Sequence, residues 1–176
     1  MATPIGIARM APTCALRKNR LMTTHTIREA VAADREWLAD CAVAMALETE
    51  HKRLEPGTVR AGIDAGIADP AKARYFVAVD DDGAPVGTLM LMREWSDWRN
   101  GDWWWIQSVY VVPAWRRRGV FAALYRHAEA LARTTPGVVG LRLYVERGNE
   151  AARRTYAALG MVDAGYDILE AGINAP

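Results

Sequence analysis

The segment SVYVVPAWRRRGVFAALY, from Ser108 to Tyr125, constrains the fold most, because three arginines and a glycine join an apolar strand-like run to an apolar helix. A helix N-terminus carries partial positive charge and unpaired N–H groups, so basic residues are disfavoured there. Gly119 lets a backbone or a ligand approach closely, as in phosphate-binding turns between a strand and a helix. The segment therefore predicts either an anion-binding turn or a solvated basic turn whose arginines pair with nearby carboxylates.

Apolar periodicity and turn residues divide the chain into alternating strands and helices. Strands are expected at residues 25–28, 74–79, 86–92, 103–112, 138–145 and 161–169. Helices are expected at about residues 32–50, 56–68, 117–133 and 149–159. The strand at 103–112 contains few polar residues, so we expect it to be buried on both faces of a sheet. The order β-α-α-β-β-β-α-β-α-β predicts an α/β (α+β) domain with a mixed sheet covered by helices.

The segment REWSDWRNGDWWW, which follows the third expected strand, combines turn residues with many tryptophans and has two interpretations. In one, Trp95, Asp97 and Trp98 form an acceptor pocket that holds a cationic amine by cation–π and ionic attraction. In the other, these rings close the core or an oligomer interface. Trp103 and Trp105 lie two residues apart, so we expect them on one face of the buried strand, in the core.

Composition excludes several classes of protein. A net charge of +1 argues against a general nucleic-acid or anionic-membrane binder, which would carry a surplus of basic residues. Cys14 and Cys41 form no C-x-x-C pair, so neither a disulfide framework nor a zinc site is indicated, and a cytoplasmic location is expected. His25, His51 and His127 form no metal-binding pattern, so we expect no metal.

The first residues of the chain differ in character from the rest. Residues 1–21 are basic and lack the unbroken apolar stretch of a signal peptide or membrane span. We expect a disordered leader here, followed by a folded domain at residues 22–176 that begins at Met22. A transit peptide is the rival interpretation, although the apolar residues show no clear helical face.

A second motif lies near the end of the chain, where residues recur at helical spacing before a glycine. Its residues are Asn149, Ala152, Tyr156 and Leu159, followed by Gly160-Met161. Together with the pattern V-Y-V-x-P-x-x-R-x-x-G at 109–119, this motif resembles the GNAT superfamily of acyl-CoA-dependent N-acetyltransferases. The resemblance covers most of the chain from about Met22 onward, and it implies a mixed, mostly antiparallel twisted sheet flanked by helices.

The resemblance also implies acetyl-CoA as co-substrate, without a metal. Backbone groups of Val109, Tyr110 and Val111 would contact the pantetheine arm and the acetyl group, and Asn149 would touch the cofactor arm. The family usually has Gly or Ala at the position of Phe121, whose ring could point into the core or could narrow the turn and weaken CoA binding. The turn that would offer N–H groups and charge to the CoA pyrophosphate consists of Arg116, Arg117, Arg118, Gly119, Val120 and Phe121.

Acyl transfer to an amine needs a deprotonated nucleophile, stabilisation of the oxyanion and a proton for the departing thiolate. The resemblance implies that a strand bulge frees the N–H group of Val109 for the oxyanion, and that Tyr156 is the general acid. The alternative for Tyr156 is an ordinary core tyrosine on an amphipathic helix.

The general base is less well specified. A carboxylate, acting directly or through water, is the usual base for an amine that arrives as an ammonium ion. Glu48 and Glu50 lie where the family builds its acceptor side, and solvated helix charges are their alternative interpretation. The other candidates near the chemistry are Glu94, Gln107 and Ser108.

The sequence therefore predicts an N-acetyltransferase that moves the acetyl group of acetyl-CoA to a primary amine of a small-molecule acceptor, by direct attack in a ternary complex. A protein acetyltransferase acting on a lysine or an N-terminus is the alternative enzyme, a non-catalytic CoA-binding sensor is the alternative of another class, and a nucleic-acid-binding module ranks third. The expected partner is the small-molecule amine, with no nucleic acid and no membrane. A homodimer would suit the tryptophan-rich surface.

Overall fold

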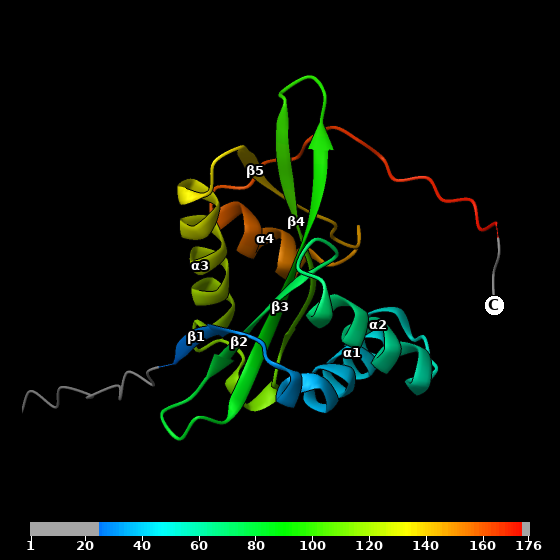
Figure 1. The fold of residues 1–176 in the computed structure, drawn as a ribbon, viewed down its shortest axis with the longest axis vertical. Coiled ribbons are helices and arrows are strands. Elements are labelled where there is room, and N and C mark those ends of the chain that lie inside the picture. Colours follow the sequence, from blue (N-terminus) through cyan, green and yellow to red (C-terminus); the bar gives the residue numbers. More distant parts are fainter. Residues whose placement is uncertain (1–24, 174–176) are drawn as a thin grey trace, which may run out of the picture.

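The computed structural model describes residues 25–173, and the expected leader at residues 1–21 lies outside this range. At its centre is a five-stranded sheet in the order β1-β2-β3-β4-β5 (Figure 1). The first four strands pair antiparallel and β5 pairs parallel with β4, which confirms the mixed, mostly antiparallel sheet. The strands are β1 Thr26–Glu29, β2 Arg74–Val79, β3 Pro85–Ser96, β4 Gly101–Val111 and β5 Val138–Leu143.

The helices follow the expected order. α3 begins at Val120 and not at Arg117, because Arg117 and Gly119 have φ angles of 62° and 86°, and left-handed residues do not continue a right-handed helix. Short 3-10 turns at Ala32–Asp34 and Pro113–Trp115 precede the first and third helices. The helices are α1 Arg35–Glu50, α2 Pro56–Ala68, α3 Val120–Thr134 and α4 Glu150–Ala158.

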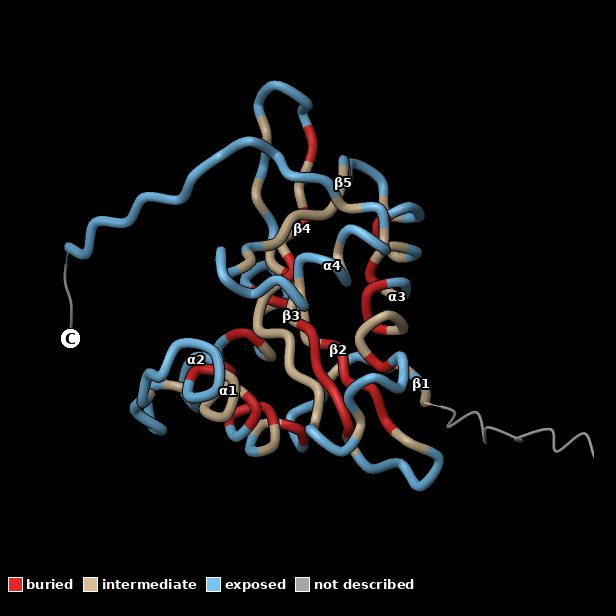
Figure 2. Tube along the Cα trace, turned by 180° about the vertical axis from the view of Figure 1, so that it is seen from behind, coloured by how far each residue is buried: buried red, intermediate tan, exposed pale blue. Residues whose placement is uncertain are grey.

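Core residues lie on both faces of the sheet, because successive side chains of a strand point to opposite faces. On one face, Leu124 of α3 packs in a cluster with Leu89 of β3, and both side chains are fully buried. On the other face, Leu38 of α1 and Ile63 of α2 pack in a cluster with Val77 of β2. Figure 2 shows the buried segments concentrated in the central strands, α1 and α3. The helices thus leave the end of the sheet where β3 turns into β4 uncovered.

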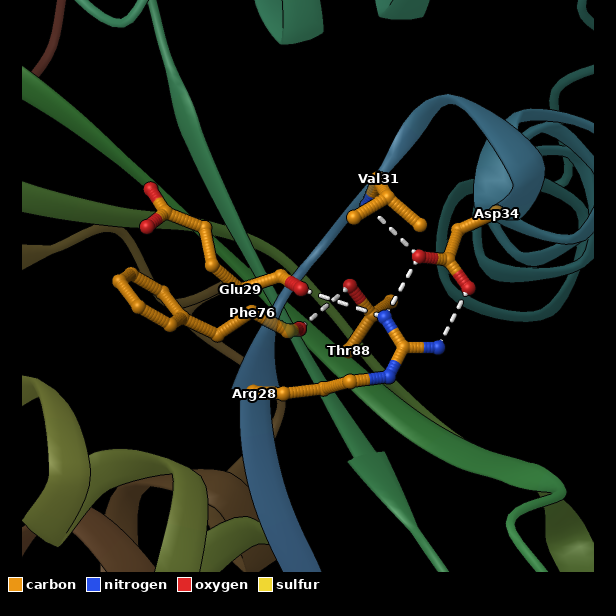
Figure 3. A network of polar contacts seen from close by, with 6 residues as sticks. All are labelled: Arg28, Glu29, Val31, Asp34, Phe76 and Thr88. Atoms are coloured by element: carbon orange, nitrogen blue, oxygen red, sulfur yellow. Dashed lines mark hydrogen bonds and ion pairs between the residues drawn. The ribbon is translucent and has the colours of Figure 1, made fainter.

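Hydrogen bonds fix the start of α1 to the first strand. Arg28 donates from Nη1 and Nη2 to the two oxygens of the Asp34 carboxylate, both at 2.7 Å, and Val31 N–H donates to Asp34 Oδ2 at 2.8 Å (Figure 3). The hydrogen bond from Arg28 is the main reason why the pKa of the Asp34 carboxyl lies below its ordinary value. Beside them, the buried Thr88 hydroxyl donates to the carbonyl oxygen of Phe76 at 3.1 Å. The network ties the first helix to the sheet.

β3 and β4 form a long hairpin whose tip extends beyond the helices (Figure 1). Pairing continues to Ser96 and Gly101, so most of the tryptophan-rich segment is strand. Trp104 is buried on the α3 face, whereas Trp103 and Trp105 are half-buried on the opposite face, so the expectation that these two rings lie in the core is wrong. The expectation that β4 is buried on both faces is also wrong, because Trp103, Trp105 and residues 107–111 of β4 are only partly buried.

The expectation of a final strand at residues 161–169 is wrong. The described residues 161–173 contain no helix or strand. Gly165 has a φ of 74°, and its N–H donates to Asp163 Oδ1 at 2.8 Å, so the chain turns where a strand would continue. Asp167 pairs with Arg147. The apolar residues that suggested a strand are therefore exposed, namely Val162, Tyr166, Ile168 and Leu169.

Membrane-spanning helices and metal-binding clusters are absent from residues 25–173. No helix in this range is long and apolar enough to cross a membrane. No group of three or more His, Cys, Asp and Glu side chains in this range could hold a metal ion.

Candidate active site

β4 contains a bulge halfway along its length. One residue of β3, Leu89, faces two residues of β4, Ser108 and Val109, because the register shifts between the flanking pairs. Ser108 has a φ of 47°, a left-handed conformation that is uncommon outside bulges and turns. A bulge takes a residue out of the hydrogen-bonded ladder and re-aims its backbone groups. The bulge expected at Val109 is confirmed, whereas the contact of its N–H group with an oxyanion stays a prediction.

β4 and β5 separate just before the bulge. The two strands pair from Asp102 to Ile106 on β4, and β5 ends at Leu143, the partner of Ile106. β4 continues to Val111, so its outer edge at residues 107–111 has no strand partner in the described part of the chain. An open strand edge presents backbone N–H and C=O groups that an extended ligand can pair with.

The turn after β4 has the geometry of an anion site. Arg117 and Gly119 are both left-handed, and Gly119 is the N-cap of α3. No backbone hydrogen bond within the described residues uses the N–H groups of residues 117–121. A Cβ atom added at Gly119 would meet nothing within 4 Å, so the space beside this residue is open. Unpaired N–H groups at a helix N-terminus, with left-handed residues beside them, form a concave site for an anion such as a pyrophosphate.

The three arginines of this turn have different surroundings. Arg116 points back toward α1, where its Nη2 pairs with Glu48 at 2.6 Å, while its Nε donates to the Val111 carbonyl oxygen at 2.9 Å. The Tyr110 hydroxyl donates to the same carboxylate at 3.2 Å. The guanidinium of Arg118 lies 5.3 Å from the Trp115 ring. Arg116 therefore pairs with a carboxylate, as the solvated-turn interpretation expects. Its contacts with Glu48 and Val111 link the turn to α1 and to the end of β4.

α4 brings the second motif to the same end of the sheet. Asn149 is the N-cap of α4, where its Oδ1 accepts from the Ala152 N–H at 3.0 Å, which leaves the amide NH₂ as a donor. Tyr156 is half-buried, and its ring meets the Phe121 ring edge-on, with centroids 5.5 Å apart. Burial raises the pKa of the Tyr156 hydroxyl, so this group is protonated at neutral pH. The structure thus brings Tyr156 beside the anion-binding turn.

Three of the expected acceptor residues lie at the hairpin tip, and Glu94 lies apart from them. Trp95 and Trp98 lie at the hairpin tip with 63% and 82% of their surface exposed, and Asp97 accepts a hydrogen bond from the N–H of Trp98 at 2.8 Å. Glu94 points to the opposite face, where it pairs with Arg142 at 3.0 Å. Adjacent strand residues alternate in direction, so Glu94 and Trp95 cannot line one pocket.

The candidate bases occupy different environments. Glu50 pairs with Lys52 at 2.6 Å at the exposed end of α1, and Glu48 is held by Arg116 as described above. Ser108 lines a cavity of about 30 Å³ between α1 and the sheet, together with Cys41 and Thr88. Burial raises the pKa of the Cys41 thiol to about 12, so this cysteine is a neutral, inert group at physiological pH.

Sequence reasoning missed a cluster of side chains on the face of the sheet opposite α3. The Arg142 guanidinium of β5 lies 4.2 Å from the Trp103 ring and 5.7 Å from the Trp105 ring. Trp105 donates from Nε1 to Glu94, and its ring lies 4.3 Å from that of Tyr144. The period-2 spacing of the two tryptophans was the available signal, but the arginine partner on a distant strand was not. The cluster stiffens the hairpin beside the open edge of β4.

Comparison with known proteins identifies a family and solved structures with the same fold. The family model described as acetyltransferase (GNAT) family matches residues 35–161. Among solved structures, a possible acetyltransferase from Clostridium difficile 630 is 36% identical, with a TM-score of 0.80 over 86% of this chain and 99% of that chain. AAC(6')-Iy in complex with the bisubstrate analog CoA-S-monomethyl-acetylneamine is 15% identical and shares the fold, with a TM-score of 0.68 over 86% of this chain and 100% of that chain. A search of curated proteins gave no match.

Proposed function

Because the chain belongs to the GNAT family of acetyltransferases, we propose that it transfers the acetyl group of acetyl-CoA to a primary amine of a small-molecule acceptor. One observation carries the proposal: the unpaired edge of β4 leads directly from the bulge at Ser108 and Val109 into the open anion-binding turn at Gly119. This arrangement suits a ligand that has an extended polar arm and a pyrophosphate, as acetyl-CoA does. The folded domain that carries it is proposed to span residues 22–176.

Backbone groups do most of the proposed binding. Backbone groups of Val109, Tyr110 and Val111 that face away from β3 contact the pantetheine arm, as a neighbouring strand would. The N–H groups of residues 117–121 and the side chains of Arg117 and Arg118 receive the pyrophosphate. Arg116 acts mainly through its ion pair with Glu48, which keeps the turn in place. The NH₂ group of Asn149 donates to a carbonyl of the arm.

The chemistry is a direct transfer within a ternary complex. The acceptor nitrogen attacks the thioester carbon, an N–C bond forms, and the C–S bond breaks as the sulfur leaves with its electron pair. The Val109 N–H donates to the oxygen of the tetrahedral intermediate, where its hydrogen bond strengthens as negative charge develops. The Tyr156 hydroxyl gives its proton to the departing thiolate, and the proton that the attacking nitrogen loses as the amide forms restores the hydroxyl. The inert Cys41 supports direct attack over an acetyl-cysteine intermediate.

The acceptor must lose its extra proton before it attacks. Glu48 and Glu50 remain the proposed bases, acting through water, because each carboxylate already holds a basic side chain. Glu94 is occupied by Arg142 and Trp105, so its proposed role is to stiffen the hairpin and not to bind the amine.

One comparison supports a small-molecule acceptor over a protein. One structural neighbour is in complex with an analog that joins CoA to acetylneamine, a small molecule. The tryptophan rings at the hairpin tip, Trp95 and Trp98, are largely exposed. We propose that a second copy of the chain covers these rings in a homodimer. The near-neutral charge and the reduced Cys41 suit a cytoplasmic enzyme.

The test is release of CoA thiol from acetyl-CoA in the presence of a panel of small primary amines. We expect turnover with at least one of them, and Tyr156→Phe should slow it about 10²-fold or more while leaving acetyl-CoA affinity unchanged. Lysine-containing peptides serve as the comparison: turnover with peptides alone would indicate a protein acetyltransferase. Acetyl-CoA binding without turnover on any acceptor would indicate a sensor, and no binding would refute every CoA-based function.

A further inference from the structure

Phe121 connects the two halves of the proposed site. It follows Gly119 and the buried Val120 in the first turn of α3, so its N–H belongs to the anion-binding turn. Its ring points the other way, toward α4 and the core on the α3 face. The ring lies edge-on to Tyr156, with centroids 5.5 Å apart and planes at 69°, and 6.3 Å from the Tyr125 ring. Such tilted contacts are the favoured geometry of aromatic pairs.

The residue before Phe121, Val120, is packed closely against β3. Val120 is 1% exposed, and its side chain packs on Gly87 of β3, where an added Cβ atom would meet Val120 Cγ1 at 2.7 Å. The first turn of α3 is therefore packed closely against the sheet at Val120, and the Phe121 ring projects from the residue that follows.

α4, in contrast, has few contacts of its own. No residue of this fully described helix is buried, and only Ala152 and Tyr156 are partly buried. Just beyond the helix, Leu159 and Met161 pack against the core cluster on the α3 face, and within the helix the Tyr156 ring is the largest side chain that is partly buried. The Tyr156 ring meets the Phe121 ring edge-on.

We propose that Phe121 is a positioning residue for Tyr156: its ring holds the tyrosine in the orientation from which the hydroxyl reaches the thiolate of CoA. This inference rests on the proposed function and on the general-acid role of Tyr156 within it. It also explains how the chain tolerates a bulky residue at this position. An added Cβ atom at Gly119 would meet nothing within 4 Å, so the Phe121 ring does not crowd this residue; the ring packs on Tyr156 of α4 and on the core of the α3 face.

A double-mutant cycle tests the proposal, using full-length Phe121→Ala, Tyr156→Phe and the double variant with one active amine. Phe121→Ala should lower kcat about tenfold and leave the KM for acetyl-CoA within about twofold, because the ring acts through Tyr156 and not on the pyrophosphate. In the Tyr156→Phe background, the same substitution should change kcat by less than about twofold. Phe121→Leu, which keeps apolar bulk, should recover part of the wild-type rate and covers the case in which the alanine variant does not fold.

Tyr125→Leu is the matched control, because Tyr125 touches the Phe121 ring but not Tyr156. Its effect on kcat should be the same with and without Tyr156→Phe. Full additivity of Phe121→Ala and Tyr156→Phe would overturn the proposal, as would a loss confined to the KM for acetyl-CoA. Tighter acetyl-CoA binding by Phe121→Ala with unchanged kcat would show that the ring narrows the turn instead. A wild-type protein without turnover on any amine would overturn the proposed function, and this inference with it, before the cycle is begun.

Discussion

Replacing Gly119 by alanine tests the anion-binding turn most selectively. Gly119 has a φ of 86°, and an added Cβ atom would meet nothing within 4 Å, so the substitution introduces no clash. The only penalty is the left-handed conformation, which costs a residue with a side chain about 1–2 kcal/mol. Because the turn is exposed, the variant can relax it in the free protein and must restore it when the pyrophosphate binds. The expected effect is a dissociation constant for acetyl-CoA about 5- to 30-fold higher.

Gly83 provides a matched control in the turn between β2 and β3. Its φ is 82°, and the space around an added Cβ atom is equally empty. Gly83→Ala should therefore carry the same conformational cost of about 1–2 kcal/mol without touching the proposed site.

Calorimetric titration with acetyl-CoA measures the difference between the two variants directly. Gly83→Ala should bind acetyl-CoA as tightly as the wild type, and Gly119→Ala should bind it more weakly by the factor given above. Melting temperatures of the free proteins serve as a check on folding, since 1 kcal/mol corresponds to about 2–4 °C in a domain of this size. Equal affinities for the two variants would refute the assignment of this turn to the pyrophosphate.

Three further predictions concern the surroundings of the site. Because the pKa of Asp34 is lowered in the folded protein, its contribution to stability is complete above the unfolded pKa of about 3.9 and is lost as the pH falls through the lower folded value. In urea unfolding, the free energies of unfolding of the wild type and Asp34→Asn should therefore differ by about 1–3 kcal/mol at pH 7 and converge near pH 2. A difference that does not change with pH would contradict this. Glu48→Gln should weaken acetyl-CoA binding no more than about fivefold, because the pair with Arg116 is solvent-exposed, and a fall in kcat in either Glu48→Gln or Glu50→Gln would identify the base; an unchanged kcat in both variants would contradict the proposal that either carboxylate takes the amine proton. Cys41→Ala should keep turnover within about twofold of the wild type in the CoA-release assay, and loss of turnover in a folded variant would show that the thiol takes part in the reaction.

Much of the fold could be predicted because local signals were strong. α2 begins at Pro56 and ends before Asp69, as expected from a proline at the first turn and the Asp69-Pro70 pair. The start of α3 was misplaced because the left-handed conformation of Arg117 has no signature in a non-glycine residue. The last strand was misplaced because apolar residues around Gly165 resemble a strand, although nothing in the sheet pairs with them.

The candidate site could be predicted only in part, because motifs report local backbone and not contacts between distant segments. The two motifs identify backbone segments, and the bulge and the turn lie where those motifs place them. Side-chain partners from distant segments could not be read from the sequence. Arg116 pairs with Glu48 of α1, and Arg142 of β5 stacks on Trp103, because the fold brings these strands and helices together. These contacts decide which charges remain available to a ligand.

The most direct test of the proposed function is the stoichiometry of one complete reaction. Full-length protein is incubated with acetyl-CoA and the best amine of the panel, and mass spectrometry follows the amine, the CoA and the protein together. Direct transfer predicts one acetylated amine for each CoA released and no acetyl group on the protein. Release of CoA without an acetylated amine, or an acetyl group retained on the protein as an intermediate, would contradict it.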